Sequence, residues 1–502
     1  MKRLEKCFRG FSECCQQIKE AWEQSKKTIL ALSVITLVAL SALLRVSFTN
    51  RDDMLRVADG YRGWYLGNRY VNDILAALIH AGRWISDISP LSQMIAIFLM
   101  AVASTITLRI FSEGQKIGWL QVFAVMPRIV FPYFLVCLSY KFDSPYMALS
   151  VLAGTFPLLY ASKNTKKYLL ISFLGTLICC MTYQASLGTY PILVLFYCYV
   201  KWNRGVWGRR KTLWFTVSSA ASYLIALVLY KLAFVRYVIP YAPGNVFSIR
   251  NLPRGVLNNY RTLYGNLNKD LIRSWKVLLV VLTICFILSM ILSTKRNRIA
   301  SGLLCVGMLL VTSFLTVGPL IVFEGQPFSA RYSYGIATPI AAMAAILSYT
   351  KGFYVGKLAA IGISWCFIVF SLTYGNAESE QMHYVDVRCG QILSDMKDVI
   401  GDTPGTEYLF EGSCGYAPTI QKLVKRMPLL KRMQLQNVGH DYFGGYYFAL
   451  HYAEGLSTYN PYIDINTLED RRVLVDNYSH RIEQSGNVYI IDVKKVKRTT
   501  TR

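Results

Sequence analysis

Runs of about 20 apolar residues recur along this chain and restrict it to one fold class. The first, TILALSVITLVALSALLRV (28–46), is long enough to cross the hydrocarbon core of a bilayer as a helix. Backbone groups find no partners in lipid, so a run of this kind satisfies its hydrogen bonds within the helix. Only 17% of the 502 residues are charged and 53% are hydrophobic. The sequence therefore predicts an α-helical polytopic membrane protein.

The apolar runs divide into eleven predicted spans, whose positions also predict an orientation. The spans are 28–46, 91–111, 119–139, 145–162, 167–183, 186–200, 213–234, 276–294, 299–320, 335–350 and 357–375. With eleven spans, the lysine- and arginine-rich segments fall on one side, namely the N-terminal segment, 162–167, 201–211, 295–298 and the loop with Lys351 and Lys357. Basic loops of membrane proteins gather in the cytoplasm, so we expect a cytoplasmic N-terminus.

Three units follow from this topology. Residues 1–27 are expected to form a cytoplasmic amphipathic segment, 28–375 the transmembrane domain with an outer loop at 47–90, and 376–502 a periplasmic domain of a bacterial inner-membrane protein. A helix at 378–400 and strands at 407–412 and 486–493 make that domain a small α/β unit. The net charge of +25 is explained by the basic loops, so no nucleic-acid partner is expected.

The outer loop begins with an acidic pair among arginines. Asp52 and Asp53 follow the first span directly, and Arg56 and Arg69 follow them in RDDMLR and GYRGWYLGNRY. A carboxylate can take a proton from an attacking hydroxyl, and arginine presents a planar fork that binds phosphate oxygens in pairs. The pattern favours group transfer from a lipid phosphate, with either aspartate as the base.

Other predicted outer-face segments add candidates. Arg331 joins Arg56 and Arg69 as a phosphate ligand, and the substrate-binding candidates are Asp143, Tyr183, Gln184 and Glu324. Asp143 precedes Ser144 and Pro145, a pattern that favours the start of a helix over a catalytic role. Residues 68–85 predict an amphipathic helix in the membrane interface. Arg128, inside the third span, is a further functional candidate without a named partner.

Cofactor and redox signals are few. Cys389 and Cys414 lie in the predicted periplasmic domain, where a disulfide between them is one outcome. The sequence has no P-loop and no zinc-ligand spacing. A divalent ion bridging Asp52 and Asp53 would need further ligands, and none stands near the pair, so no metal or other cofactor is expected.

RDDMLR followed by GYRGWYLGNRYVNDIL resembles the serotype-converting O-antigen glucosyltransferases of bacteria and their phages. FDSPYMALS, TYQASLGTY and SARYSYG fall where that family has similar segments, and the resemblance covers about residues 48–400. This chain has GNR where the family has a GR-like element, so the arginine match there rests on Arg69.

The resemblance implies a GT-C-like fold that uses polyprenyl-phosphate sugars. Such an enzyme moves glucose from undecaprenyl-phosphate glucose to the lipid-linked O-antigen on the periplasmic face, which changes the lipopolysaccharide serotype. Its implied partners are membrane lipids, a small flippase and a glucosyltransferase that makes the donor.

Three other functions are weighed against this one. A lipid-linked glycan transporter or flippase would place charges deep in several spans and often has internal symmetry. An O-antigen polymerase or ligase tends to depend on a large outer loop late in the chain, whereas the acidic pair here follows the first span. A membrane scaffold would not need eleven spans as its anchor.

Overall fold

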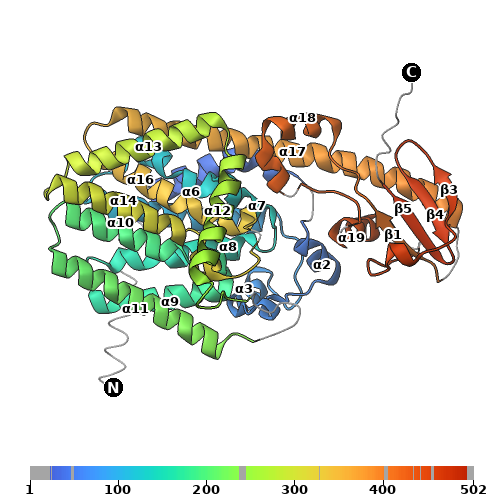
Figure 1. Cartoon of the computed structure of the whole chain (residues 1–502), viewed down its shortest axis with the longest axis horizontal. Coiled ribbons are helices and arrows are strands. Elements are labelled where there is room, and N and C mark those ends of the chain that lie inside the picture. Colours follow the sequence, from blue (N-terminus) through green and yellow to red (C-terminus); the bar gives the residue numbers. More distant parts are fainter. Residues whose placement is uncertain are drawn as a thin grey trace.

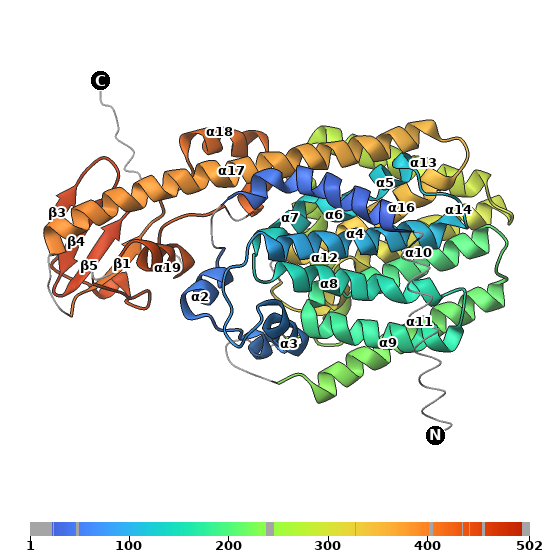
Figure 2. The same ribbon diagram turned by 180° about the vertical axis from the view of Figure 1, so that it is seen from behind.

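The computed structural model describes residues 23, 25–46, 50–236, 245–326, 328–400, 405–433, 435–440, 442–453 and 457–493. These residues form a helical bundle, with a small sheet beyond one end of it (Figure 1). A single helix, α17 (Tyr354–Ile400), runs along the bundle and on to the sheet (Figures 1 and 2). The predicted class, a helical membrane protein with a small C-terminal α/β unit, is confirmed at this level.

In the described part of the chain, six helices are long and apolar enough to cross a membrane. They are Ser25–Leu44, α4 (Leu91–Ser112), α11 (Arg209–Ala233), α13 (Arg273–Leu292), α14 (Arg298–Leu315) and α17. A seventh candidate is broken, because α5 (Trp119–Val125) and α6 (Pro127–Val130) meet α7 (Pro132–Ser139) at a bend of 58°. Proline lacks the N–H that a continuous helix needs, which explains why α6 and α7 each begin at one.

The other four predicted spans are also helical, but they are shorter or less apolar. They correspond to α8 (Ser144–Thr155) with η2 (Phe156–Tyr160), α9 (Thr165–Thr182), α10 (Thr189–Asn203) and α16 (Ala337–Tyr349). Helices α8, α10 and α16 are buried on nearly every side, whereas α11, α13 and α14 expose large apolar side chains. Length and composition thus support six spans, or seven with the bent helix, of the eleven predicted.

Several short helices lie between the long ones. The loop that the sequence places at 47–90 contains α2 (Asp52–Asp59), η1 (Trp64–Gly67) and α3 (Tyr70–Ile79). Helix α3 is the predicted amphipathic helix, which ends well before residue 85 because Ala81 takes a positive φ of 51°. Helix α12 (Leu252–Asp270), which the apolar runs do not predict, crosses the direction of the bundle helices (Figure 1).

Two glycines bring distant segments together beside α2. The segment η3 (Gln184–Ser186) lies against η4 (Gly318–Val322) and η5 (Tyr334–Ile336), the last of which follows α15 (Ala330–Ser333). A Cβ at Gly188 would overlap the carbonyl of Leu315, and one at Gly335 would overlap that of Thr316. Close backbone approach of this kind requires glycine, so TYQASLG and SARYSYG share one site.

The C-terminal unit is a five-stranded mixed sheet with flanking helices. Its order is β2-β1-β5-β4-β3, where β1 is parallel to β2 and β5, and β4 is antiparallel to β3 and β5. The strands are β1 (Glu407–Glu411), β2 (Thr458–Tyr459), β3 (Arg472–Asp476), β4 (Arg481–Ser485) and β5 (Val488–Asp492). The other elements are α18 (Pro418–Arg426), η6 (Pro428–Arg432), α19 (Tyr442–His451) and η7 (Ile465–Thr467). Both strands expected from the sequence, β1 and β5, are present and paired.

The structure differs from two predictions for the C-terminal half. The helix at 378–400 is present, but as the last part of α17, so the boundary placed at residue 375 falls inside a continuous helix. Cys389 and Cys414 are both buried and both free, so no disulfide joins them. The predicted cytoplasmic segment 1–27 lies largely outside the described residues.

Candidate active site

The acidic pair divides between two environments. Asp53 is fully buried. Its Oδ2 accepts a 2.7 Å hydrogen bond from the backbone N–H of Lys141, and its Oδ1 accepts one of 3.4 Å from that of Phe142. Asp52, one residue earlier, keeps 42% of its side chain exposed. Consecutive residues of a helix are rotated by about 100°, so the turn that buries one carboxylate leaves the other facing outward.

Arg56 connects Asp53 to a second buried carboxylate, that of Asp143. Its Nη1 lies 2.7 Å from Oδ2 of Asp143 and 3.7 Å from Oδ1 of Asp53. The indole N–H of Trp64 donates to Oδ1 of Asp143 at 2.6 Å, and the Trp64 ring centre lies 4.3 Å from the guanidinium carbon of Arg56. We call these four side chains the buried network. Asp143 stands at the N-cap of α8 but makes no capping hydrogen bond, so its carboxylate serves the network instead.

The buried network holds two carboxyl groups and one cation. Burial raises the pKa of Asp53 well above its usual range, the Asp143 carboxylate raises it further, and Arg56 offsets only part of this. Burial also raises the pKa of Asp143, but Arg56 and the Trp64 N–H outweigh it, so that pKa lies below its ordinary value. Asp143 therefore carries the ion pair with Arg56, and Asp53 holds its proton more tightly.

This assignment predicts how pH acts on an Asp53→Asn variant. A carboxyl whose folded pKa is raised contributes most stability at low pH, and that contribution is lost as the pH rises from about 4 toward the folded value. Asparagine has no proton to lose. The melting temperature of Asp53→Asn minus that of the wild type should therefore grow between pH 5 and pH 8, as measured by thermal unfolding in detergent. A difference that shrinks with pH would mean that the folded protein favours ionised Asp53.

Asp52 faces Arg331 at the rim of the buried network. Oδ2 of Asp52 lies 3.4 Å from Nη1 of Arg331, which keeps 23% of its side chain exposed. Nη2 of Arg331 donates to the hydroxyl of Tyr332 at 3.0 Å, and its guanidinium carbon lies 5.0 Å from the ring centres of both Tyr140 and Tyr332. The aromatic rings orient the guanidinium. An anion that binds beside Asp52 would therefore contact a cation that is already held in position.

Tyr183, Gln184 and Arg69 extend this rim. The Tyr183 hydroxyl donates to the backbone carbonyl of Arg331 at 3.0 Å, and its ring centre lies 5.1 Å from the guanidinium carbon of Arg69. Nε of Arg69 donates to Oε1 of Gln184 at 3.3 Å, while Nε2 of Gln184 donates to the hydroxyl of Tyr230 at 3.1 Å. The amide of Gln184 is thus used to hold Arg69. Asp52, Arg331, Tyr183 and Arg69 form what we call the rim.

Two charged candidates from the sequence lie apart from the rim. Glu324 is exposed, and its backbone N–H donates to the carbonyl of Asn245 at 2.8 Å. Among the described residues no ion pair joins Glu324 to the other candidates. Arg128 is buried inside the bundle, where it donates to the hydroxyls of Thr107 and Thr155. These contacts supply the partners that the sequence did not reveal, and they make Arg128 part of the bundle interior.

Sequence reasoning missed the aromatic groups and one long-range contact. Trp64 and Tyr332 lie within the motifs GYRGWYLGNRY and SARYSYG, and Tyr140 stands three residues before Asp143, so their position beside charged candidates was the available signal. Arg432, in contrast, comes from η6 of the C-terminal unit and donates to the carbonyl of Phe328 at 2.7 Å. Phe328 has a positive φ of 43° and stands three residues before Arg331. No local pattern links Arg432 to this loop.

No group of three or more histidine, cysteine, aspartate or glutamate side chains in the described part of the chain is arranged to hold a metal ion. The rim offers one partly exposed carboxylate and two cations beside aromatic rings, and the buried network supports it from below with a third cation, Arg56, paired to buried carboxyl groups. This arrangement suits proton abstraction next to an anionic group.

Comparisons with known proteins agree with this chemistry. The family model described as Glucosyl transferase GtrII matches residues 41–343, which is more than half of the chain. A protein of Salmonella phage P22, described as an uncharacterized 55.3 kDa protein in the gtrB 5′ region, is 31% identical over 145 residues. That match covers 29% of this chain and 29% of the phage protein. No solved structure matches the chain.

Proposed function

The chain belongs to the GtrII glucosyl transferase family, and from this premise we propose that it moves glucose from undecaprenyl-phosphate glucose to a sugar of the lipid-linked O-antigen. The resemblance found in the sequence is confirmed at the level of the family. The rim carries the proposal for this reaction, because it combines an accessible carboxylate with arginines at a place suited to a lipid phosphate.

We assign Asp52 as the general base. The reaction needs a base that takes the proton of the acceptor hydroxyl as its oxygen attacks the anomeric carbon. Asp52 is 42% exposed while Asp53 is fully buried and bound to two backbone N–H groups. The bond from the anomeric carbon to the phosphate oxygen breaks as the new glycosidic bond forms, and the electron pair leaves with the lipid phosphate.

Arg331 and Arg69 are our candidates to neutralise the leaving phosphate. Arg331 is oriented by two tyrosine rings, and Arg69 is held by Gln184 and Tyr183. Arg56 was a third candidate from the sequence. Its side chain is 9% exposed and paired with Asp143, so we propose that it supports the position of α2 and leaves phosphate binding to the rim.

The cellular setting is part of the same proposal. We place the rim on the periplasmic face of a bacterial inner membrane, with the N-terminus in the cytoplasm and the C-terminal unit outside. The supporting pattern is the gathering of lysine and arginine in the loops at the other end of the helices. A small flippase and a donor-synthesising glucosyltransferase would supply the lipid-linked glucose, and the product would be a modified lipopolysaccharide serotype.

Arg331→Ala is expected to lower the rate of glucosyl transfer about 10²–10³-fold, the loss typical when a donor that stabilises developing negative charge is removed. Arg331→Lys should retain more activity, because it keeps the charge but loses the planar fork. The measurement is release of lipid phosphate from undecaprenyl-phosphate glucose by membranes that contain each variant. Arg250→Ala, which changes an exposed arginine elsewhere, is the control. Equal activity of Arg331→Ala and the control would remove Arg331 from phosphate binding.

The function itself is tested by chemical analysis of surface polysaccharide. A strain that carries the gene should add a glucose side branch that the same strain lacks without it. An altered distribution of chain lengths without a new branch would instead favour a polymerase. Accumulation of lipid-linked sugar on one membrane face, with no new linkage, would favour a flippase.

A further inference from the structure

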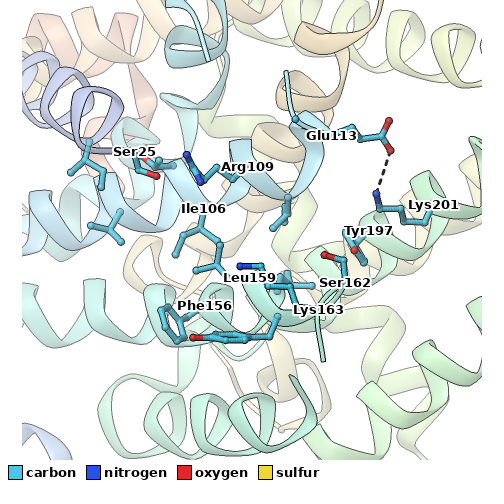
Figure 3. A pocket seen from close by; sticks show the side chains of 17 residues that line it. Ser25, Ile106, Arg109, Glu113, Phe156, Leu159, Ser162, Lys163, Tyr197 and Lys201 are labelled. Atoms are coloured by element: carbon cyan, nitrogen blue, oxygen red, sulfur yellow. Dashed lines mark hydrogen bonds and ion pairs between the residues drawn. The ribbon is translucent and has the colours of Figure 1, made fainter. Parts of the chain in front are cut away.

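A second site lies at the end of the bundle opposite α2 and α3. There a cavity of about 380 Å³ opens between the first apolar helix, the end of α4, η2 with the segment after it, and α10 (Figure 3). Its apolar walls include Ile106, Phe156 and Leu159, while Arg109 and Lys163 also line it. The cavity is thus partly apolar and partly cationic.

The charges that line this cavity do not cancel. Arg109, Lys163 and Lys201 carry three positive charges, and Glu113 carries one negative charge. Glu113 is already paired, since its Oε1 lies 3.3 Å from Nζ of Lys201 (Figure 3). Its Oε2 lies 2.8 Å from Nη1 of Arg204. In the described part of the chain the ammonium of Lys163 has no ion pair. The cavity therefore has a net positive charge that suits an anion.

An apolar groove adjoins the cavity. Ile29 lines both the cavity and a hollow of about 520 Å³ between the first apolar helix and α4. Apart from Lys26, Lys27 and Ser33, the groove is lined by apolar residues, among them Leu30, Leu37 and Phe98. A ligand that occupies both spaces needs an anionic end and a hydrocarbon chain.

We propose that this cavity binds the phosphate headgroup of an anionic membrane phospholipid, with an acyl chain in the groove along the first helix. A free phosphate ion would make no use of the apolar walls, and an uncharged lipid would leave the net positive charge of the cavity uncompensated. Basic pockets between membrane helices commonly receive anionic headgroups, and each nearby lysine or arginine strengthens binding. This inference rests on the membrane placement of the bundle and does not depend on the glucosyl transfer reaction.

The test uses the purified full-length protein in detergent, stripped of lipid and titrated with dioleoylphosphatidylglycerol or dioleoylphosphatidylcholine. Bound lipid is counted by native mass spectrometry. We expect phosphatidylglycerol to bind at least tenfold more tightly than phosphatidylcholine. Lys163→Gln should weaken phosphatidylglycerol binding about fivefold, and Glu113→Gln should strengthen it, because it raises the net positive charge. Lys166→Gln removes an exposed lysine outside the cavity and should leave binding unchanged.

Several results would overturn the proposal. Equal binding of the two lipids, or the same loss in Lys166→Gln and Lys163→Gln, would show that the cavity does not select an anionic headgroup. Displacement of phosphatidylglycerol by millimolar inorganic phosphate would assign the cavity to a free anion. Tighter, Lys163-dependent binding of undecaprenyl phosphate would assign it to the sugar carrier. Glucosyl transfer is not the readout, so failure here leaves the proposed reaction untouched.

Discussion

Asp52→Asn is expected to lower glucosyl transfer about 10²–10⁴-fold, which is the usual contribution of a positioned general base. Asparagine preserves the size of the side chain and can still contact Arg331, so the protein should reach the membrane at wild-type levels. The measurement is incorporation of labelled glucose into the lipid-linked acceptor by isolated membranes. The loss should appear mainly in kcat, because the proton is taken in the transition state.

Two further variants make this result specific. Asp59→Asn changes an exposed acid at the other end of α2 and should keep full activity. Asp53→Asn retains an oxygen that can accept from the Lys141 N–H, so we expect it to keep most of the activity. If Asp52→Asn were active and Asp53→Asn inactive, the base would be the buried aspartate and the role given to exposure would be wrong.

Arg56→Met is expected to destabilise the protein by about 3–5 kcal/mol, since it leaves the buried carboxylate of Asp143 without its cation. Arg56 and Asp143 are 9% and 5% exposed, so water cannot replace the lost partner well. The measurement is thermal unfolding in detergent, compared with Arg83→Met, which alters an exposed arginine of the same loop.

The double variant Arg56→Met/Asp143→Leu separates charge from packing. Removing both charges together should recover part of the stability lost in Arg56→Met, because the unpaired carboxylate of Asp143 is then absent. If the double variant lost more unfolding free energy than the two single variants lose in sum, the hydrogen bond from the Trp64 N–H and the packing of Arg56 would matter more than the charge. A loss below about 1 kcal/mol in Arg56→Met would mean that the network tolerates an unpaired Asp143.

Residue type and position in the sequence pointed to side chains that the structure brings together, but not to the environment of each one. Asp52, Asp53, Arg56, Asp143 and Arg331 were all chosen from residue type and position. Ion pairs join Arg56 to Asp53 and Asp143, and a separate ion pair joins Arg331 to Asp52. The sequence does not show how α2 is rotated about its own axis relative to the loop at 140–143. This rotation buries Asp53 and leaves Asp52 partly exposed. It depends on packing between segments almost 90 residues apart.

The sequence likewise predicted some helices and missed the presence or the ends of others. Runs such as 91–111 are mostly apolar, so their position was read directly from the sequence. Helix α12 was missed because its sequence is mostly polar and so gives no apolar run. The boundary at residue 375 followed a change in composition, but a change in composition does not end a helix, and α17 continues to Ile400.

Helix α17 has a mechanical consequence for the C-terminal unit. At a rise of about 1.5 Å per residue, its 47 residues form a rod about 70 Å long with no hinge between bundle and sheet. Any tilt of this rod within the membrane would swing the sheet along with it, and Arg432 would then pull on the carbonyl of Phe328, near Arg331. The C-terminal sheet therefore cannot reorient relative to the bundle unless α17 itself bends.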